Sequence, residues 1–379
     1  MNIIYFDNSA TTKINTEVLN KMIPFLTTKF GNASSLYTIG RKSKRAIENA
    51  RKQVAQLINC KQNEVYFTAG GSESDNLAVK GFVYANREKG NHIITSKIEH
   101  PAILETCEML VKQGFEVTYI DVDENGFIKI DELKDSIKPT TILISVMASN
   151  NEIGTIQPIE EIAKIAHENN IVFHTDAVQG VGNMPIDVTK MNIDMLSLSG
   201  HKIHAPKGIG ALYVKSGINI EKIISGGHQE KDKRAGTENV AGIVGLGKAC
   251  EIANKNMDTH IKYLTRLRDY YIKKLQNEIP GKFRINGSME NRLPGNANVS
   301  FEGINSSELI FKLDEKGICV SSGSACSSGN SRPSHVLQAI NVPEKYLNSA
   351  IRTTFGDDNT FEQIDYLIRI LKTQVRKPS

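Results

Sequence analysis

The sequence has little net charge, no long hydrophobic run and few cysteines, and each absence excludes a class of protein. Its 46 lysines and arginines against 42 aspartates and glutamates leave a formal net charge of +4 over 379 residues. That is too little for the basic footprint of a nucleic-acid-binding protein. Unbroken apolar runs such as residues 142–148 are far too short to span a bilayer. We therefore expect no direct nucleic-acid partner and no membrane association.

The five cysteines are Cys60, Cys107, Cys250, Cys319 and Cys326. Their odd number and the lack of CxxC spacing argue against a disulfide framework and against a zinc site, so we expect no bound metal. The first residues, MNIIYFDNSATT, lack the basic start and the apolar stretch of a secretion signal. These features predict a cytoplasmic protein in a reducing compartment.

Short β-branched runs alternate with amphipathic stretches over the first half of the chain. The expected strands are residues 65–68, 92–95, 116–120, 142–147, 171–175, 194–199 and 210–214. Most are apolar on both faces, as in strands that helices cover on each side. Helical patterns such as PIEEIAKIAHENN, with Pro158 in its first turn, lie between them. The alternation predicts an α/β domain with a mostly parallel sheet.

A change of texture follows a long amphipathic helix expected at about residues 258–278. Beyond it, turn-rich segments, short strands near Val299 and Ile351 and a terminal helix indicate a smaller α+β domain. We therefore divide the chain into a large domain of residues 16–257 and a small domain of residues 1–15 and 258–379. The segment SSGSACSSGNSRPS (residues 321–334), rich in Gly and Ser, is expected to form a mobile loop that carries Cys326.

Residues suited to cofactor chemistry follow two of the expected strands. SLSGHK ends in Lys202, which could form a Schiff base with an aldehyde cofactor if partial burial lowers its pKa. Upstream, DAVQ contains Asp176 and Gln179. A carboxylate at the carboxyl end of a strand points into the ligand crevice of an α/β sheet, where it can keep a pyridine nitrogen protonated. Taken alone, Lys202 is better explained as a surface lysine in a turn, and Asp176 is equally compatible with a helix cap.

A candidate phosphate cradle lies in FTAGGSESDN (residues 67–76). Two glycines lead into a helix start at which Ser72 and Asp75 have the spacing of a capping box. Free amides at such a helix start, together with the Ser72 hydroxyl, can bind a phosphate. The segment lacks the lysine of a Walker motif and the spacing of a dinucleotide GxGxxG motif. By itself it is also compatible with a tight turn into a capped helix.

Three further residues stand out by position. His100, just past an expected strand, can stack on a planar ring and move protons near neutral pH, although a lone histidine is more often an ordinary buried polar residue. Asn151 can hydrogen-bond a ring substituent or a carboxylate. Core packing does not explain Cys326 in a Gly/Ser loop. Its thiolate could accept an atom in a pocket and carry it to a partner, and an incidental surface thiol is the alternative.

Together these motifs resemble the cysteine desulfurases of the NifS/IscS type, which are class-V aminotransferase-like, fold-type-I pyridoxal-phosphate (PLP) enzymes. The resemblance covers nearly the whole chain in order and spacing. It runs from YFDNSATT and FGNASSLYTIGR through GGSESDNLAVKG, EHPAIL, NNEIGT, HTDAVQ and SGHK to KRAGTENV, SSGSACSSG and AIRTTFG. It implies the α/β PLP-dependent transferase fold of type I, PLP as cofactor, L-cysteine as substrate and a homodimer.

The resemblance also implies roles at the cofactor. Lys202 would bind the cofactor and shuttle protons, Asp176 would pair with the pyridinium nitrogen, and Gln179 would hydrogen-bond the phenolic oxygen. His100 would stack on the ring. The phosphate would be held by Gly71, Ser72, Ser199, His201 and, from across the dimer interface, the partner subunit's Thr237.

At the substrate, the resemblance implies that Asn151 and Arg352 anchor the carboxylate, a task suited to a guanidinium fork, and that Cys326 carries a persulfide. The implied reaction gives L-alanine and sulfur for an acceptor, such as an iron–sulfur scaffold or a tRNA-thiolating enzyme. A selenocysteine lyase or related PLP lyase is the alternative among enzymes. A non-catalytic iron–sulfur assembly scaffold is disfavoured, because Lys202 and Cys326 are both present.

The sequence departs from the family pattern at three places. Ser72 stands where threonine is usual and keeps the hydroxyl. His204–Ala205 precede Pro206, where the family typically has a glycine beside the proline. Asp357 and Asp358 stand where a basic residue is common. The last change leaves the choice of sulfur acceptor open, but not the chemistry.

Overall fold

The computed structural model describes residues 3–323 and 333–375. Its central sheet has seven strands: β2 (Val65–Thr68), β3 (His92–Ser96), β4 (Glu116–Ile120), β5 (Thr141–Ser145), β6 (Val172–Asp176), β7 (Met195–Ser199) and β8 (Gly210–Val214). All seven correspond to strands expected from the sequence, with ends that differ by at most two residues. The prediction of an α/β fold with a mostly parallel sheet is confirmed.

The strand order in this sheet is β2-β8-β7-β6-β5-β3-β4. The pairs β3–β4, β3–β5, β5–β6 and β6–β7 are parallel, whereas β8 is antiparallel to both of its neighbours, β7 and β2. Six strands therefore run in one direction and only β8 runs in the other. Because of this, the carboxyl ends of β2, β7, β6, β5 and β3 all lie at one edge of the sheet.

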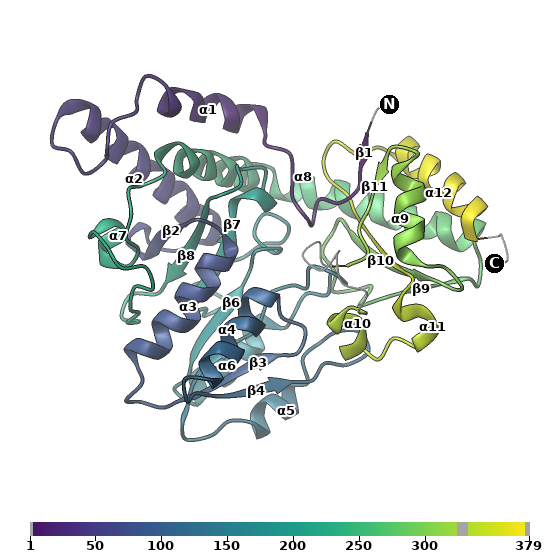
Figure 1. Ribbon diagram of the computed structural model, residues 1–379, viewed down its shortest axis with the longest axis horizontal. Coiled ribbons are helices and arrows are strands. Elements are labelled where there is room, and N and C mark those ends of the chain that lie inside the picture. Colours follow the sequence, from purple (N-terminus) through teal and green to yellow (C-terminus); the bar gives the residue numbers. More distant parts are fainter. Residues whose placement is uncertain (1–2, 324–332, 376–379) are drawn as a thin grey trace.

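Helices cover both faces of the sheet (Figure 1). They are α2 (Thr38–Ile58), α3 (Gly71–Ala85), α4 (Pro101–Val111), α5 (Ile130–Asp135) and α6 (Ile159–Glu168). Successive strand residues alternate between two apolar clusters: Ile144 and Leu196 pack in one with α2 and α6, and Leu143 and Met195 in the other with α3 and α4. Burial of both faces explains why the strands read as continuous apolar runs.

The helix α8 (Val240–Glu278) begins 18 residues before the expected start at residue 258. The sequence pattern missed this first half because it is apolar on all sides and contains three glycines, which weaken helices. Packing explains both features. A Cβ at Gly245 would lie 2.7 Å from Met22 Sδ of α1 (Thr16–Leu26), and one at Gly247 would lie 2.6 Å from the Ala50 backbone of α2. Tertiary contact therefore stabilises this part of α8.

The second half of α8 packs against a separate apolar cluster that includes Phe6, Val299 and Ile351. Around it lie β9 (Phe283–Ile285), β10 (Asn296–Phe301) and β12 (Ala350–Thr354), which form an antiparallel sheet in the order β12-β10-β9. The N-terminal strand β1 (Ile4–Tyr5) pairs in parallel with β11 (Ile318–Cys319). The helices here are α9 (Ser306–Asp314), α10 (His335–Ala339), α11 (Glu344–Leu347) and α12 (Phe361–Val375). The strands expected near Val299 and Ile351 and the terminal helix are present.

Short elements complete the chain: η1 (Gln62–Glu64), η2 (Gly200–Lys202) and α7 (Gln229–Asp232). Among the helices of the described ranges, none combines the length and the apolar character that crossing a membrane requires.

Candidate active site

The strand directions bring the predicted cofactor residues to one edge of the sheet. Asp176 is the last residue of β6, and Ser199 is the last residue of β7, directly before the η2 turn that contains His201 and Lys202. Gly71 and Ser72 begin α3 just after β2. His100 follows β3, and Asn151 follows β5. This is the edge at which ligands of α/β sheets bind.

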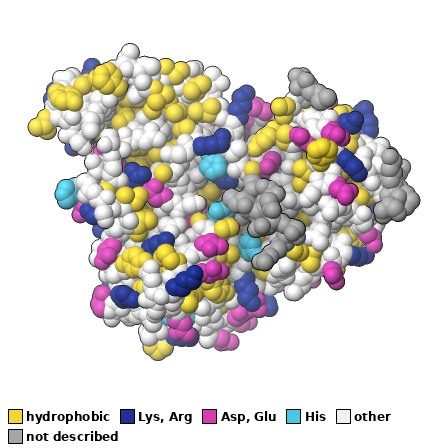
Figure 2. Space-filling model, viewed as in Figure 1, with side chains coloured by type: hydrophobic (Ala, Val, Ile, Leu, Met, Phe, Trp, Pro, Cys, Tyr) yellow, Lys and Arg dark blue, Asp and Glu magenta, His cyan; other side chains and the backbone are white. Residues whose placement is uncertain are grey.

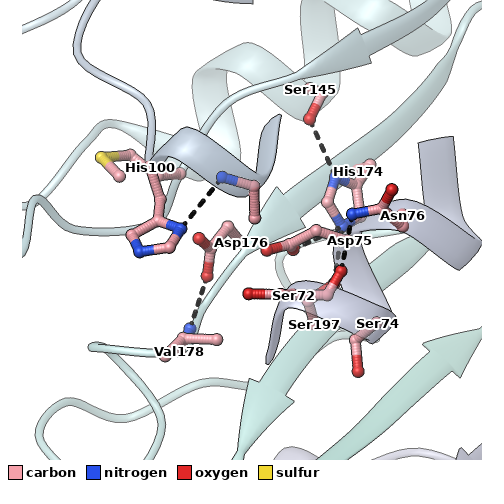
Figure 3. A network of polar contacts seen from close by, with 12 residues as sticks. Ser72, Ser74, Asp75, Asn76, His100, Ser145, His174, Asp176, Val178 and Ser197 are labelled. Carbon is pink, nitrogen blue, oxygen red and sulfur yellow. Dashed lines mark hydrogen bonds and ion pairs between the residues drawn. The ribbon is translucent and has the colours of Figure 1, made fainter. Parts of the chain in front are cut away.

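Asp176 is a buried carboxylate with one hydrogen bond to the backbone. It is 6% exposed, and its Oδ1 accepts from the Val178 amide at 2.9 Å. Burial raises the pKa of Asp176, while the charges of His100 and Lys202 lower it. Figure 3 shows the carboxylate between the His100 ring and the side chain of Asp75. Such a group is suited to pair with a cation that enters from the His100 side.

The phosphate-cradle residues lie close together. A Cβ on Gly71 would be only 2.7 Å from Val178 Cγ2, so glycine lets the start of α3 approach the segment after β6 closely, and Ser199 of β7 lies at contact distance, 3.5 Å from the same position. The predicted capping box is wrong. The N-cap of α3 is Gly70 with no side-chain hydrogen bond, Ser72 lies inside the first turn, and Asp75 is buried in the helix. The first amides of α3 and the exposed Ser72 are thus available to an anion.

His201 belongs to the same corner. Its Nδ1 lies 3.1 Å from the Thr11 hydroxyl. Burial and the charges of Lys202 and Lys207 lower the pKa of His201 to about 4, so the ring is neutral near pH 7 and can donate one hydrogen bond to an anion.

Lys202 and Gln179 converge on the N-terminal segment. Gln179 Nε2 donates to the Ser9 carbonyl at 3.0 Å, and Lys202 Nζ donates to the same carbonyl and to that of Ala10, the latter at 2.9 Å. The segment before α1 therefore forms one wall of the site. Sequence patterns could not assign this role, because backbone carbonyls carry no residue-specific signal.

His100 caps α4 while it faces the site. Its Nδ1 accepts from the Ala102 amide at 3.1 Å, which leaves the proton of the neutral ring on Nε2. Burial lowers the pKa of His100; Asp176 opposes this shift, and Lys202 and His335 add to it. The alternative that His100 is an ordinary buried polar residue is therefore partly correct, since its hydrogen bond to the Ala102 amide caps α4. That bond also fixes the plane of its ring.

A buried polar network behind Asp176 was not predicted from the sequence (Figure 3). His174 Nδ1 lies 2.9 Å from the Ser145 hydroxyl, and its Nε2 lies 3.0 Å from the Ser197 hydroxyl and 3.9 Å from Asp75 Oδ1. Burial lowers the pKa of His174 to about 3 and raises the pKa of Asp75 well above its usual range. Asp75 Oδ1 has no hydrogen-bond partner among the described residues. The one available signal was the run of three polar residues, His174 to Asp176, at the end of the otherwise apolar strand β6.

Asn151 and Arg352 are brought together, although they lie 201 positions apart in the sequence. Arg352 Nη1 donates to the Asn151 carbonyl at 3.1 Å, and its Nη2 forms an ion pair with Asp7 at 2.8 Å. The guanidinium is 1% exposed, and its Nε has no partner among the described residues. Arg352 is thus a buried cation held on one side only, as a carboxylate-binding residue requires.

Two predicted residues are not part of this group. Thr237 is exposed in the segment between α7 and α8. Cys326 lies outside the described residues. The other four cysteines are described, and burial raises the pKa of each thiol, to about 12 for Cys60, Cys107 and Cys250.

The departures at residues 204 and 357 lie beside a cavity of about 250 Å³ that also reaches Lys202 and Gln179. Asp357 Oδ1 accepts from His260 Nδ1 at 2.7 Å, and His260 Nε2 lies 3.1 Å from Asn183 Oδ1. Burial alone would raise the pKa of Asp357, but the bond to His260 lowers it. The acid at this position therefore has a partner within the chain.

These residues fit pyridoxal phosphate. Asp176 offers a buried anion for the ring nitrogen, Lys202 an amine for the aldehyde, and Gln179 an amide for the phenolic oxygen. The open corner at Gly71, with the hydroxyls of Ser72 and Ser199 and the His201 ring, offers donors for the phosphate.

Comparisons with known proteins agree with this fit. Residues 4–367 match the model of the family described as Aminotransferase class-V. The chain is 52% identical over 374 residues to "Cysteine desulfurase IscS" of Methanosarcina thermophila, which spans 99% of this chain and 92% of that protein. It is 51% identical over 376 residues to the protein of the same name from Clostridium botulinum, over 99% of this chain and 94% of that protein.

Solved structures show the same fold. One described as a NifS-like protein has a TM-score of 0.92 at 37% identity and covers 98% of this chain and 99% of its own. Another, "SspA in complex with cysteine", has a TM-score of 0.82 at 39% identity over 94% of this chain and 99% of its own. The family resemblance, the fold type and the cofactor predicted from the sequence are thus confirmed. The chain belongs to the class-V aminotransferase family and, within it, to the pyridoxal-phosphate-dependent cysteine desulfurases of the IscS/NifS type.

Proposed function

We propose that this protein converts L-cysteine to L-alanine and holds the released sulfur as a persulfide on Cys326. The observation that carries the proposal is the convergence of Lys202, Gln179, Asp176 and His100 at the carboxyl edge of the sheet. The printed names of the relatives, and a related structure described in complex with cysteine, support cysteine as the substrate.

Pyridoxal phosphate supplies a pyridinium ring that withdraws electrons from the α-carbon of an attached amino acid. The Asp176 carboxylate holds the proton on the ring nitrogen. The Lys202 amine, next to the Ser9 and Ala10 carbonyls, takes the proton from the substrate α-carbon. The Nε2–H group of the neutral His100 ring can give a proton to the departing product.

Arg352 binds the substrate carboxylate. Its Nη2 donates to the Asp7 carboxylate, and its buried Nε, which has no partner among the described residues, is available to a carboxylate oxygen of the substrate. Asn151, whose backbone carbonyl accepts from Nη1, lies next to the same guanidinium and carries a side-chain amide that can donate to a carboxylate. Two donors on adjacent segments would fix the orientation of the amino acid.

Cys326 attacks the substrate sulfur as a thiolate. The S–Cβ bond of cysteine breaks, its electron pair stays with the carbon that becomes alanine, and the sulfur remains on Cys326. Protonation of the other four thiols supports this choice, since the thiolate is the nucleophile and burial disfavours it at Cys60, Cys107, Cys250 and Cys319.

The active form is a homodimer in which the partner subunit's Thr237 completes the phosphate cradle. A cluster of exposed apolar side chains supports a dimer; Figure 2 shows it over α1 and the start of α2. We call it the N-terminal apolar patch, and its members are Leu19, Ile23, Leu26, Phe30, Leu36 and Tyr37. Phe30 is 73% and Leu36 is 88% exposed, and a patch of this kind is typical of an interaction surface.

The domain division is proposed at residues 257 and 258, within α8. The clusters around α8 support it, since one includes Cys250 and Met257 and the other begins at Tyr263 and Leu264. We also propose that the protein acts in the cytoplasm and passes sulfur to an iron–sulfur scaffold or a tRNA-thiolating enzyme. The IscS names of the relatives support a sulfur-transfer role.

Substitution of Cys326 tests the function. The Cys326→Ala protein is expected to keep the yellow colour of the bound cofactor and to produce almost no alanine, whereas Lys202→Ala should be colourless. Mass spectrometry of the wild-type protein after brief exposure to cysteine should find one extra sulfur on the Cys326 peptide. Cys319→Ser serves as the matched control and should retain activity.

Normal turnover by Cys326→Ala, or the extra sulfur on another cysteine, would show that the persulfide assignment is wrong. Faster turnover of selenocysteine than of cysteine, independent of Cys326, would instead favour a selenocysteine lyase.

A further inference from the structure

The segment that carries Thr237 is tied to its own subunit by a buried ion pair. Arg51 of α2 binds Glu230 of α7 with two hydrogen bonds, Nη1 to Oε2 at 2.6 Å and Nη2 to Oε1 at 2.9 Å. Both side chains are 4% exposed. A bidentate pair shielded from water fixes the position and the direction of both groups. Figure 1 shows α7 beside α2 at this end of the molecule.

The same two residues also hold strand β2. Glu230 Oε2 accepts from the Phe67 amide at 2.8 Å, and Arg51 Nη1 donates to the Val65 carbonyl at 2.8 Å. The guanidinium also lies 4.7 Å from the centre of the Phe67 ring. Strand β2 leads directly into Gly70 and Gly71 of the candidate phosphate cradle. The α7 segment is therefore attached to the strand that precedes this cradle.

A second ion pair lies closer to Thr237. Arg234 Nε donates to Glu73 Oε1 at 2.8 Å, and the other oxygen of Glu73 accepts from the Ala69 amide at 2.9 Å. These side chains are partly exposed, at 23% and 16%. On the other side of Thr237, Asn239 Oδ1 caps α8 by accepting from the Gly242 amide at 3.0 Å. Thr237 is thus exposed between two fixed points.

The backbone of α7 is strained. Glu230, Lys231 and Asp232 have φ values of 46°, 56° and 65°, in the left-handed region that non-glycine residues rarely occupy. Three such residues in succession persist only where surrounding contacts hold them. The Arg51–Glu230 pair provides that contact, because Glu230 is itself one of the three.

We propose that Arg51 and Glu230, together with Arg234 and Glu73, are positioning residues for the cofactor site of the neighbouring subunit. They fix the segment on which Thr237 is presented across the dimer interface. This inference rests on the proposed role of Thr237 in the partner's phosphate cradle. It adds that ion pairs in one subunit control how tightly the neighbouring subunit binds its cofactor.

Mixed dimers test the proposal. One subunit carries Lys202→Ala, so only the other subunit can form the yellow Lys202-bound cofactor. Glu230→Gln is then placed either on the Lys202→Ala subunit or on the subunit with intact Lys202, and the cofactor affinity is measured from the visible absorbance. We expect about tenfold weaker binding when Glu230→Gln lies on the Lys202→Ala subunit, the effect of roughly one hydrogen bond to a charged group. A smaller loss is expected in the other arrangement, where Glu230→Gln acts only through the Phe67 contact of strand β2 in the same subunit.

Arg234→Met, at the partly exposed pair, is the second variant and should show the same asymmetry even if Glu230→Gln folds poorly. Lys215→Met, which removes a 3.2 Å ion pair with Asp194, is the matched control and should leave both arrangements unchanged.

The inference would be overturned if the cofactor affinity fell equally in the two arrangements, or if it fell only when the variant and the intact Lys202 lie on the same subunit. Thr237→Ala in the same scheme separates this from the proposed function. Thr237→Ala could weaken cofactor binding in the partner subunit while each ion-pair variant has the same effect in both arrangements. In that case only the inference fails. If Thr237→Ala has no effect across the interface, the shared cradle itself is wrong.

Discussion

Three buried carboxyl groups, those of Asp75, Glu99 and Asp176, lie behind the cofactor site, and burial raises the pKa of each. Their surroundings differ. The charges of His100 and Lys202 lower the pKa of Asp176, whereas the charge of Asp176 further raises the pKa of Asp75 and of Glu99. Asp176 is therefore the one of these three carboxyl groups whose pKa cationic neighbours lower, and it is the one suited to pair with a cationic ring nitrogen. The three carboxyl groups are chemically similar, and they differ in pKa because different groups surround them.

Replacement of Asp176 tests this division. Asp176→Asn is expected to bind the cofactor but to lose turnover on the order of 100-fold, because an amide cannot hold the ring nitrogen protonated. Asp75→Asn is the matched control, since burial raises the pKa of Asp75 well above its usual range and an amide matches the neutral carboxyl group in shape. Steady-state alanine formation and the visible spectrum measure both effects. Near-normal turnover of Asp176→Asn would remove it as the partner of the ring.

Glu99 predicts a pH dependence of stability. Its carboxyl accepts from Ser96 and from the Met147 amide, and burial raises its pKa from 4.5 to about 8. Between these values the folded protein keeps a proton that the unfolded chain has lost, so stability falls as the pH rises from about 4.5 to about 8. Glu99→Gln should remove this loss of stability. Its free energy of unfolding at pH 8 should exceed that of the wild-type protein by on the order of 2 kcal/mol.

Urea unfolding at several pH values measures that difference. The exposed Glu160→Gln is the control and should show the wild-type pH dependence. An advantage of Glu99→Gln that is the same at low and high pH would contradict the assignment.

At the scale of elements, the start of α3 decides whether a phosphate can bind. The helix begins at Gly71, next to Ser199 at the end of β7, and no side chain caps its first amides. Had Ser72 and Asp75 formed the expected capping box, those amides would be occupied. The site thus depends on an uncapped helix end whose polar groups remain free for a ligand.

Gly71→Ala is expected to weaken cofactor binding by about tenfold, because the new methyl group would lie 2.7 Å from Val178 Cγ2 and push the start of α3 away from the segment that follows Asp176. Gly114→Ala is the matched control. Its φ of +91° makes alanine strained, but nothing lies within 4 Å of the added Cβ, so it should lower stability without changing affinity. Absorbance titration and thermal unfolding separate the two effects; equal affinities of both variants would contradict the prediction.

At the scale of the whole molecule, α8 joins two apolar cores, and the N-terminal apolar patch lies at the far end from β9–β12 (Figures 1 and 2). The patch is formed by α1 and the residues that lead into α2, and both helices pack directly on α8. A second subunit docked there would cover apolar side chains that water now contacts. A dimer formed through this patch would thus be connected to the cofactor site through the packed helices α1, α2 and α8.

Phe30→Glu combined with Leu36→Glu is expected to convert the dimer to monomers and to reduce cofactor occupancy, because two buried charges at an interface are costly. Phe311→Glu on α9 is the matched control, since Phe311 is 65% exposed but lies outside the patch. Light scattering gives the mass, and absorbance gives the occupancy. A double variant that remains dimeric would place the interface elsewhere.

The sequence by itself determined the local elements and the identity of the main cofactor residues. Apolar runs predict strands because burial of both sheet faces requires them, and Asp176, Lys202 and Gly71 follow strands at positions that family motifs make recognisable. It did not determine the order of the strands or the reversed direction of β8, since these depend on pairing between distant segments. The first half of α8 was missed for the same reason: its glycines oppose a helix locally, and packing on α1 and α2 restores it.

Only the tertiary structure decided which polar residues act together. The contact of Arg352 with Asp7 and Asn151, the network of Asp75, His174 and Ser197, and the pairing of Arg51 with Glu230 all join residues far apart in the sequence. Their charge states follow from burial, which no local pattern encodes, because the dielectric environment of a side chain is set by whatever the rest of the chain packs around it.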